Sequence, residues 1–577
     1  RDARSSRMTA RLPENLDLIA AAPDGIRKLR GLILELAVRG KLVPQDLDDE
    51  PARELLKRIA KERARLEEEG SRKKSKPMPR TREGDQPFDI PDNWEFVCLG
   101  GVLEMINGRA FKPADWRTTG IPIVRIQNLN NPAAPHNYCD AETLDSRHRL
   151  SSGDFLISWS GTPGTSFGAF IWNRGEAALN QHIFRCVQIG AGFGKEFLRL
   201  AINSQLSILI SKAQGGVGLQ HVTKGTLEAL ALPLPPLAEQ HRIVAKVDEL
   251  MALLDRLEGE QADAEAAHTR LVDTLLGTLT QSTEAADLAV NWQRFAEHFD
   301  TLFTTESSVN ALKQTILQLA VMGKLVPQDP DDEPASELLK RIARERTRME
   351  AEGTCKESRP ALPVGEDEQW HEVPKNWQWS RLGQLVLKSG AGWSPTCELR
   401  PRENDEWGVL KVSAVSWGVF DSDQNKALPS TVQPRAEFEV VTGDFLVSRA
   451  NTAELVARSV VVEDCPSRLM LSDKIVRLTL SNLTNARFIN LANSCCGARN
   501  YYAAVAGGTS ASMKNVSREQ ILNLLIPIPP LAEQNRIVAK VDELIALCDR
   551  LKADLAESRG RQQRLAATLI ESALTSG

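Results

Sequence analysis

The chain has 577 residues, of which 42% are hydrophobic and 25% charged, with a net charge of −5. A single hydrophobic core stops growing near ~250–300 residues, so we expect several domains. No apolar run reaches the ~20 residues that span a bilayer, and the first residues lack the apolar centre of a signal peptide. We therefore expect a cytoplasmic protein with no membrane partner. The negative net charge does not by itself indicate a nucleic-acid partner.

An N-terminal tail at 1–23 precedes a shared helical block at 24–69. Apolar spacing predicts a first helix at 26–39, and Gly40 suits the left-handed conformation that often ends a helix. Asp49-Glu50-Pro51 predicts the start of a second helix, because proline is favoured in the first helical turn. That helix extends to about Glu69.

The helical block is repeated later in the chain. Residues 32–67 return at 315–350, and 28 of the 36 positions are identical. A repeat of this length predicts a duplicated architecture. Because 26 residues at 233–258 also return at 527–552, with 21 identical, the duplication covers two blocks in each half.

The segments between the repeated blocks hardly resemble each other. A linker at 70–89 leads to the first variable segment, 90–232, which carries 12 Lys and Arg against 11 Asp and Glu. Short β-rich runs, helical stretches and glycine or proline turns predict an α/β domain there. The basic run at 72–76 is compatible with a solvated linker or a DNA contact.

A long helix follows at 233–280, opened by Pro235-Pro236. Its apolar residues recur at spacings of four and three, which is typical of a coiled-coil seam. The seam comprises Ile243, Val247, Leu250, Leu254 and Leu257, then Gln261, Ala264, His268, Leu271 and Leu275. We expect the long helix to bury this stripe against its copy, with His268 and Gln261 as polar breaks that set the register.

The second half repeats the order. The ranges are a connector at 281–308, a helical block at 309–352, a linker at 353–372, a variable segment at 373–526 and a second long helix at 527–577. The second variable segment carries 17 Lys and Arg against 14 Asp and Glu. The second seam comprises Ile537, Val541, Leu544, Cys548 and Leu551, then Leu555, Ser558, Gln562, Leu565 and Leu569. The expected fold is α/β (α+β) and multidomain: two α/β domains joined by an antiparallel helical pair, with pseudo-two-fold symmetry.

No catalytic or metal site emerges from the motifs. No lysine follows an acidic residue by two positions, as a common Mg²⁺-dependent nuclease motif requires, and no G-x-x-x-x-G-K-[ST] phosphate loop occurs. The histidines lack metal-ligand spacing, and Cys495-Cys496 favours reduced thiols over a redox or metal site. The chain therefore favours recognition or scaffolding over catalysis.

The chain resembles Type I restriction–modification specificity subunits in several motifs. Two of them, PPLAEQxRIVAKVDEL and GKLVPQD, occur in both halves. The others are IPIVRIQNL and GDFLISWSGTPG in the first half, and GVLKVSAVS and GDFLVSRANT in the second. The resemblance covers about 24–577 and matches the long form with an extended N-terminal block. It implies that each variable segment is a target recognition domain for one half of a bipartite DNA site. It also implies partners: two methyltransferase subunits that bind S-adenosylmethionine, and restriction subunits that use ATP and Mg²⁺. This chain itself is expected to bind no cofactor, and we expect the extended block to dock the methyltransferase subunits.

Base edges are read mainly by Arg, Lys, Asn, Gln, Ser and Thr, usually from loops. The candidate DNA contacts in the first variable segment are Arg109, Lys112, Arg125, Gln127, Asn128, Ser160, Thr162, Gln220 and Lys224. Those in the second are Lys411, Ser413, Ser416, Arg449, Asn451, Thr452, Ser510, Lys514 and Arg518. Trp159 favours a place in the core over base stacking.

Two other classes of function stay open. The chain could be a scaffold that holds two partner subunits without reading a specific site, and the absence of a bipartite methylated motif in cells would favour that. It could also be an enzyme, which cleavage or methylation of DNA by the purified chain alone would establish.

Overall fold

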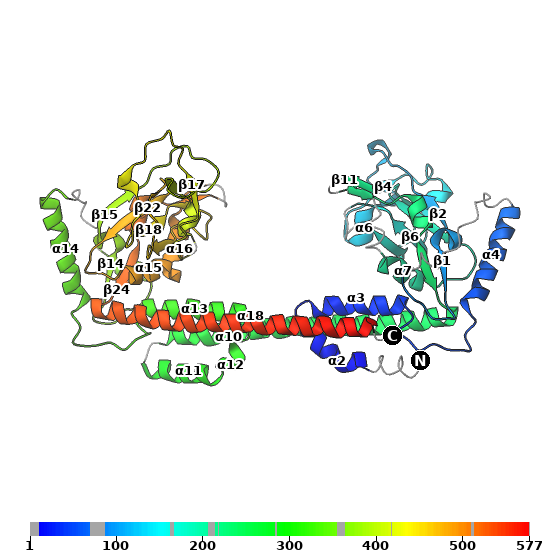
Figure 1. Cartoon of the computed structure of the whole chain (residues 1–577), viewed down its shortest axis with the longest axis horizontal. Coiled ribbons are helices and arrows are strands. Elements are labelled where there is room, and N and C mark those ends of the chain that lie inside the picture. Colours follow the sequence, from blue (N-terminus) through cyan, green and yellow to red (C-terminus); the bar gives the residue numbers. More distant parts are fainter. Residues whose placement is uncertain are drawn as a thin grey trace. The chain divides into compact units, whose positions relative to one another are not determined.

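The computed structural model describes residues 11–69, 87–161, 167–205, 214–216, 219–282, 285–354, 364–416, 418–508 and 513–575. The chain divides into two compact units (Figure 1). Unit 1 consists of Arg1–Ala264 with Ser558–Gly577, and unit 2 of Glu265–Glu557. Each unit has its own large hydrophobic core.

Unit 1 begins with three helices, α2 (Arg11–Ala20), α3 (Gly25–Val38) and α4 (Ala52–Glu68). Helix α3 is fully amphipathic, and its buried residues, such as Leu29 and Ile33, recur at helical spacing. The expectation of a tail at 1–23 is wrong for its second half. Helix α2 buries Leu16 and Ile19 in the same core as α3, because these apolar residues lie on one helical face.

Among its described residues, the first variable domain contains sheets ordered β2-β10-β6-β8, β4-β3-β9-β5 and β11-β12-β7, and a two-stranded pair, β1-β13. The strands are β1 (Glu95–Cys98), β2 (Leu103–Asn107), β3 (Ile121–Val124), β4 (Asn137–Cys139), β5 (Arg149–Leu150), β6 (Asp154–Ser158), β7 (Ser160–Gly161), β8 (Gly168–Trp172), β9 (Ala177–Leu179), β10 (Ile183–Gln188), β11 (Gln214–Gly216), β12 (Leu219–His221) and β13 (Ala231–Leu234). The helices are α5 (Leu99–Val102), α6 (Ile126–Asn130), α7 (Lys195–Ser204) and α9 (Lys224–Glu228).

The central strand β6 explains the run of apolar residues in DFLIS. Phe155 and Ile157 point into the cluster that includes α7, whereas Leu156 points into a second cluster with Val124 and Trp172. Alternate residues of a strand face opposite sides. The sheet is therefore covered on both faces, which requires a continuous apolar run rather than an alternating one.

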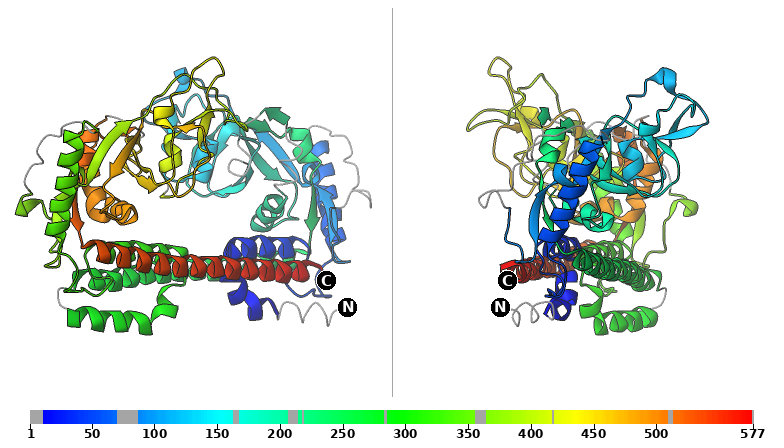
Figure 2. Two further views of the ribbon diagram at one scale, coloured as in Figure 1. Left: turned by 60° about the vertical axis from the view of Figure 1, so that its left-hand side comes forward. Right: turned by 90° about the vertical axis from the view of Figure 1, so that its right-hand side faces the viewer.

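Unit 2 contains α11 (Ala285–Glu297) and α12 (Phe299–Leu302), followed by α13 (Glu306–Val321) and α14 (Ala335–Ala351), which cover the repeated helical block. The segment 281–308, expected as a connector, contains α11 and α12. Phe295 and Phe303 are buried against each other, with ring centroids 5.2 Å apart, so this segment contributes to the core of unit 2. Figure 2 shows α14 beside the second variable domain, where Arg346 donates a hydrogen bond to the Gly383 carbonyl.

The second variable domain repeats the order of the four-stranded sheet as β15-β22-β18-β20. Its other sheets are β17-β16-β21, β19-β23 and β14-β24. The strands are β14 (Gln378–Arg381), β15 (Val386–Ala391), β16 (Gly408–Leu410), β17 (Asn425–Ala427), β18 (Phe445–Ser448), β19 (Ala450–Asn451), β20 (Ser459–Val461), β21 (Leu469–Met470), β22 (Ile475–Leu480), β23 (Lys514–Asn515) and β24 (Leu525–Ile528). The helices are α15 (Ala486–Ser494), α16 (Cys496–Val505), α17 (Arg518–Leu522) and the short 3₁₀ helix η6 (Val412–Val415). Mixed sheets and helices in both units confirm the α/β class.

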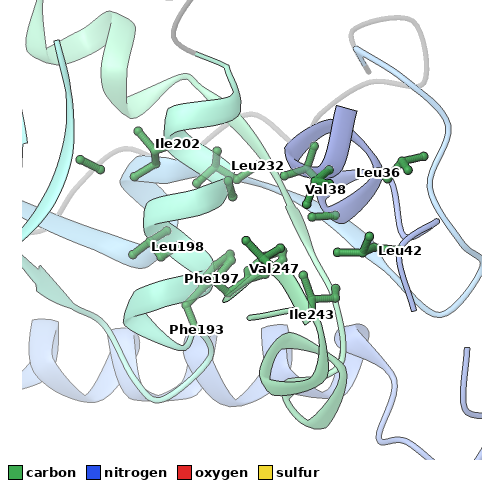
Figure 3. Close-up of a cluster of buried hydrophobic side chains, with 14 of the residues drawn as sticks. Leu36, Val38, Leu42, Phe193, Phe197, Leu198, Ile202, Leu232, Ile243 and Val247 are labelled. Carbon is green, nitrogen blue, oxygen red and sulfur yellow. The ribbon is translucent and has the colours of Figure 1, made fainter. Parts of the chain in front are cut away.

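Two long helices, α10 (Leu237–Gln281) and α18 (Leu531–Thr575), each have 45 residues. We expected their apolar stripes to be buried against each other. In unit 1, however, Ile243 and Val247 belong to one cluster with Val38 of α3 and with Phe197 and Leu232 of the variable domain (Figure 3). The first part of the stripe therefore attaches the variable domain to its long helix.

The seam residues differ in burial. Ile243, Val247, Leu250, Leu254, Ile537, Val541 and Cys548 are buried, and Leu257, Leu544 and Leu551 are partly buried. Further along, the expected stripe is displaced by one residue, because Leu271 and Leu565 are exposed while Val272 and Ala566 are buried. An ideal helix has 3.6 residues per turn rather than 3.5, so a heptad stripe drifts around a straight helix by about 20° per heptad.

Candidate nucleic-acid interface

Both variable domains use one backbone arrangement where the central strand ends. After β6, strand β7 pairs with β12, so that Gly161 lies opposite Gln220. After β18, strand β19 pairs with β23, so that Asn451 lies opposite Lys514. We call these two regions the reading edges: residues 159–161 with 219–224 in unit 1, and residues 449–452 with 514–518 in unit 2.

The first reading edge contains three of the candidate residues. Ser160 is buried on β7, and Gln220 lies on β12. At the start of α9, Lys224 donates a hydrogen bond from Nζ to the Met105 carbonyl at 3.0 Å and lies 3.7 Å from Glu228. Thr162 lies outside the described residues. The strand pairing therefore places Ser160 opposite His221 and Gly161 opposite Gln220, while Lys224 is bonded to the neighbouring sheet.

The other candidates of the first domain lie in two separate segments, one before β3 and one at the start of α6. Arg109 donates to the Thr143 carbonyl at 2.9 Å and approaches Asp115 at 3.3 Å, whereas Lys112 is exposed. Arg125, Gln127 and Asn128 surround the carbonyl of Pro135, with donor–acceptor distances between 3.3 and 3.5 Å.

Asn128 is fully buried, and its carbonyl oxygen accepts the Arg125 backbone N–H. Its amide also donates to the Ala134 carbonyl, so both ends of the side chain bond to backbone groups of this loop. A side chain used in this way orders the loop. Of this group, only Gln127 is exposed.

The second reading edge brings the candidates of its domain closer together. Asn451 donates from Nδ2 to the Ser416 hydroxyl at 2.8 Å, which joins β19 to η6. Ser416 is buried and donates to the Val412 carbonyl, and Ser413 donates to Gln424. Loop residues from two parts of the chain therefore form one surface.

The cations of this second surface differ in their partners. Lys514 donates to the Gly508 carbonyl at 2.7 Å, and Arg518 approaches the Ser389 carbonyl at 3.4 Å. Lys411 and Arg449 are partly exposed and, within the described part of the chain, their side chains make no hydrogen bond or ion pair. Thr452 is partly exposed beside them, and Ser510 lies outside the described residues. Unpaired guanidinium and ammonium groups beside hydroxyls suit contacts with phosphates and base edges.

Trp159 and Arg449 occupy equivalent backbone positions in the two domains. Each directly follows the central strand, and its N–H donates to a carbonyl just before the neighbouring strand, His182 for Trp159 and Lys474 for Arg449. Trp159 packs against the unit 1 core and stacks on Phe184 at 5.7 Å, as the sequence predicted. The same frame therefore presents an aromatic ring in one domain and a cation in the other.

The repeated motifs meet at the start of each long helix. In unit 1, Glu239 is fully buried and accepts hydrogen bonds from Trp94 Nε1 at 2.9 Å and Gln45 Nε2 at 2.5 Å. Beside it, Arg242 forms a bidentate pair with Asp49, at 2.6 and 3.2 Å. We call this group the first junction. It joins Gln45 and Asp49 of the GKLVPQD segment and Trp94 to the start of α10.

Unit 2 contains the same junction residue for residue. Glu533 accepts from Trp377 at 2.9 Å and from Gln328 at 2.6 Å, and Arg536 pairs with Asp332 at 2.6 Å. Burial raises the pKa of Glu239 and of Glu533 above the ordinary value, although the hydrogen bonds from Trp and Gln oppose that change. Sequence reasoning did not single out these residues. The available signal was their recurrence in both copies of the GKLVPQD and PPLAEQ motifs and in the Asn-Trp pairs at 93–94 and 376–377.

Trp116 is a surface residue that sequence reasoning also missed. It is 45% exposed and lies between the exposed Lys112 and the exposed Arg117 in a loop of the first domain. An exposed indole beside two cations is a feature of nucleic-acid surfaces. The signal was an aromatic residue flanked by charges in a proline- and glycine-containing segment.

The described part of the chain contains no group of three or more His, Cys, Asp or Glu residues that could hold a metal ion. No helix within it is long and apolar enough to cross a membrane. The basic run at 72–76, a possible DNA contact, lies outside the described residues.

Comparisons with known proteins identify relatives over nearly the whole chain. A family model described as the Type I restriction modification DNA specificity domain matches residues 91–266. The Type I restriction enzyme EcoEI specificity subunit of Escherichia coli is 39% identical over 560 residues, covering 95% of this chain and 94% of that protein. The EcoAI specificity subunit of Escherichia coli is 35% identical over 575 residues, with the same two coverages.

Among solved structures, the HsdS subunit of Thermoanaerobacter tengcongensis is 17% identical and matches with a TM-score of 0.40, covering 84% of this chain and 98% of that one. A chain from a structural study of the type I R-M system is 19% identical, with a TM-score of 0.48, covering 84% of this chain and 99% of that one.

Proposed function

We propose that this chain, which belongs to the family of Type I restriction enzyme specificity subunits, reads a bipartite and asymmetric DNA site. Each variable domain reads one half-site. In this proposal the chain performs no chemistry of its own. It positions two adenine methyltransferase subunits and the ATP-dependent restriction subunits on DNA.

The observation that carries this proposal is the pair of reading edges. Their backbone pairing is shared, but the side chains at equivalent positions differ, as Trp159 and Arg449 show. A backbone frame that is kept while its side chains change is what two readers of unlike sequences require, because sequence is read by side chains at base edges. A scaffold without sequence reading does not require the difference.

The side chains that fit direct contact are those with exposure and free hydrogen-bonding capacity. In the second domain these are Lys411, Arg449 and Thr452, and in the first domain Lys112 and Gln127. Asn128, Ser160 and Ser416 are buried, and in this proposal they shape the loops that carry the contacts.

The long helices set the gap between the half-sites in this proposal. They form an antiparallel pair related by a pseudo-two-fold axis, so that two identical methyltransferase subunits find equivalent surfaces. S-adenosylmethionine, ATP and Mg²⁺ belong to the partner subunits. The exposed charged faces of α4 and α14, repeated in sequence, are the expected docking surfaces.

Long-read mapping of methylated adenine tests this function in cells that carry the methyltransferase gene, with and without the gene for this chain. We expect one methylated motif with two unlike halves and a constant gap, present only with this chain. Methylation without a bipartite motif would contradict the proposal and favour a scaffold that holds two partners.

A further inference from the structure

The repeated GKLVPQD segment forms a loop that contacts both long helices within each unit. These loops span 40–49 in unit 1 and 323–332 in unit 2. Gly40 and Gly323 open them with φ of 69° and 71°, which favours glycine. A Cβ at either glycine would lie within 3.1 Å of the junction tryptophan, so the loop is packed tightly against Trp94 or Trp377.

Each loop holds the start of one long helix. Gln45 bonds to Glu239 and Asp49 to Arg242, both in the first two turns of α10. In unit 2 the copy, Gln328 and Asp332, holds Glu533 and Arg536 of α18.

The lysine of the same loop holds the end of the other long helix. Lys41 donates from Nζ to the Leu574 carbonyl at 3.0 Å, one residue before the end of α18. Lys324 donates to the Thr280 carbonyl at 2.7 Å and to the Ser282 carbonyl at 2.8 Å, at the end of α10. The last carbonyls of a helix lack intrahelical donors and carry partial negative charge, so a cation satisfies them both by hydrogen bonding and by charge.

The bonding pattern has a geometric consequence. Helix α10 is held at its start by the loop of unit 1 and at its end by the loop of unit 2, and helix α18 is held the other way round. Both helices have 45 residues, or about 66 Å at ~1.5 Å per residue. Because both long helices have the same length and are held at both ends, neither can shift along its axis relative to the other without breaking a lysine contact.

We propose that the GKLVPQD loops act as register clamps, in which Lys41 and Lys324 are positioning residues that determine the number of base pairs allowed between the two half-sites. The inference rests on the proposed reading of a bipartite site. It assigns the extended N-terminal block a role in gap selection, separate from any docking of partner subunits.

The first test removes the lysine contacts and keeps the size of the side chains. We compare the methylated adenine maps of the intact methyltransferase complex carrying wild-type chain, the double variant Lys41→Met and Lys324→Met, and its Lys→Arg counterpart. Both half-sites should be unchanged in the Met variant. The share of methylated sites whose gap differs by one or two base pairs should rise about tenfold, which corresponds to losing about 1.4 kcal/mol of discrimination.

The Arg variant should restore the single gap, because guanidinium also bonds to helix-end carbonyls. The matched control is Lys246→Met with Lys540→Met, two partly exposed helix lysines that pair with Glu249 and Glu543 and should leave the gap unchanged. If the Met variant methylates fewer sites but with an unchanged gap, the lysines only stabilise the fold and the inference is wrong. If wild-type chain gives no bipartite motif, the proposed function itself fails.

A second test leaves Lys41 and Lys324 unchanged and alters the length of the long helices instead. Seven residues of helical sequence are inserted after Ala264, after Ser558, or after both. The double insertion should give one new gap, longer by about three base pairs at ~1.5 Å per residue and ~3.4 Å per base pair. After a single insertion, sites of no one gap length should be methylated efficiently, because the two long helices then differ in length. A single insertion that methylates one new gap as well as the double insertion would contradict the clamps.

Discussion

The junctions and the reading edges of this molecule follow opposite rules. At the junctions, the same side chains make the same bonds in both units, as Glu239 with Trp94 and Glu533 with Trp377 show. At the reading edges, the same backbone pairing carries unlike side chains. Buried hydrogen-bonded groups tolerate little change, whereas exposed side chains can vary at small cost to stability. The comparison separates what holds the protein together from what distinguishes its two halves.

The largest expected effect is at a junction. Trp377→Ala removes a buried ring and leaves Glu533 with one donor fewer, so the free energy of unfolding of unit 2 should fall by about 3–5 kcal/mol. Trp94→Ala should have an effect of the same size in unit 1. Urea unfolding followed by tryptophan fluorescence and circular dichroism measures both losses. The exposed Leu399→Ala is the control, and a loss below about 1 kcal/mol in either Trp variant would show that the junctions are not equivalent supports.

A change at a reading edge should affect one half-site and leave stability unaltered. Arg449→Ala removes an unpaired cation, and the binding free energy of the assembled methyltransferase complex for its site should weaken by about 1–3 kcal/mol. Fluorescence anisotropy with labelled duplexes measures this, using sites altered in one half at a time. Lys375→Ala, which removes an exposed cation before β14, is the matched control. Equal loss of discrimination in both halves would contradict the assignment of one half-site to each domain.

The smallest effect is a pH dependence at the junctions. Burial raises the pKa of Glu239 and Glu533, so the folded chain binds these two protons more tightly than the unfolded chain. Their contribution to stability is therefore greatest at low pH and decreases as pH rises from the ordinary value of 4.5 through the folded pKa. The measurement compares the melting temperatures of the wild-type chain and of the double variant Glu239→Gln and Glu533→Gln. The wild-type value minus the variant value should decrease as the pH rises from 4.5 through the folded pKa. A difference that rises with pH would show that the carboxylates are stabilised in their charged form.

The sequence predicted the parts of the fold that the duplication makes visible. Helices α3, α4, α13 and α14 and both long helices begin and end within a few residues of the expected bounds. The repeat supplies two versions of each helix, so positions that keep an apolar residue in both versions reveal the buried face. Helices α2, α11 and α12 were missed because their two versions share few residues and resemble linkers in composition.

The reading edges could be predicted only in part. Motifs such as GDFLIS locate the end of the central strand, and from there the candidate segments follow. The direction of each side chain does not follow, because a Ser or Asn at a strand end can bond its own loop or face a ligand. Asn128 and Ser416 do the first, whereas Arg449 and Lys411 keep their charged groups unpaired. That distinction depends on distant backbone carbonyls, which local sequence does not reveal.

The most direct test of the account is an exchange of one variable domain. Residues 90–232 are replaced by the corresponding domain of a relative with a known half-site, and methylated adenine is mapped in cells that also carry the methyltransferase subunit. The account predicts that one half of the motif changes to that of the donor, while the other half and the gap remain. A change in both halves would contradict it, because the two readers would then not be independent.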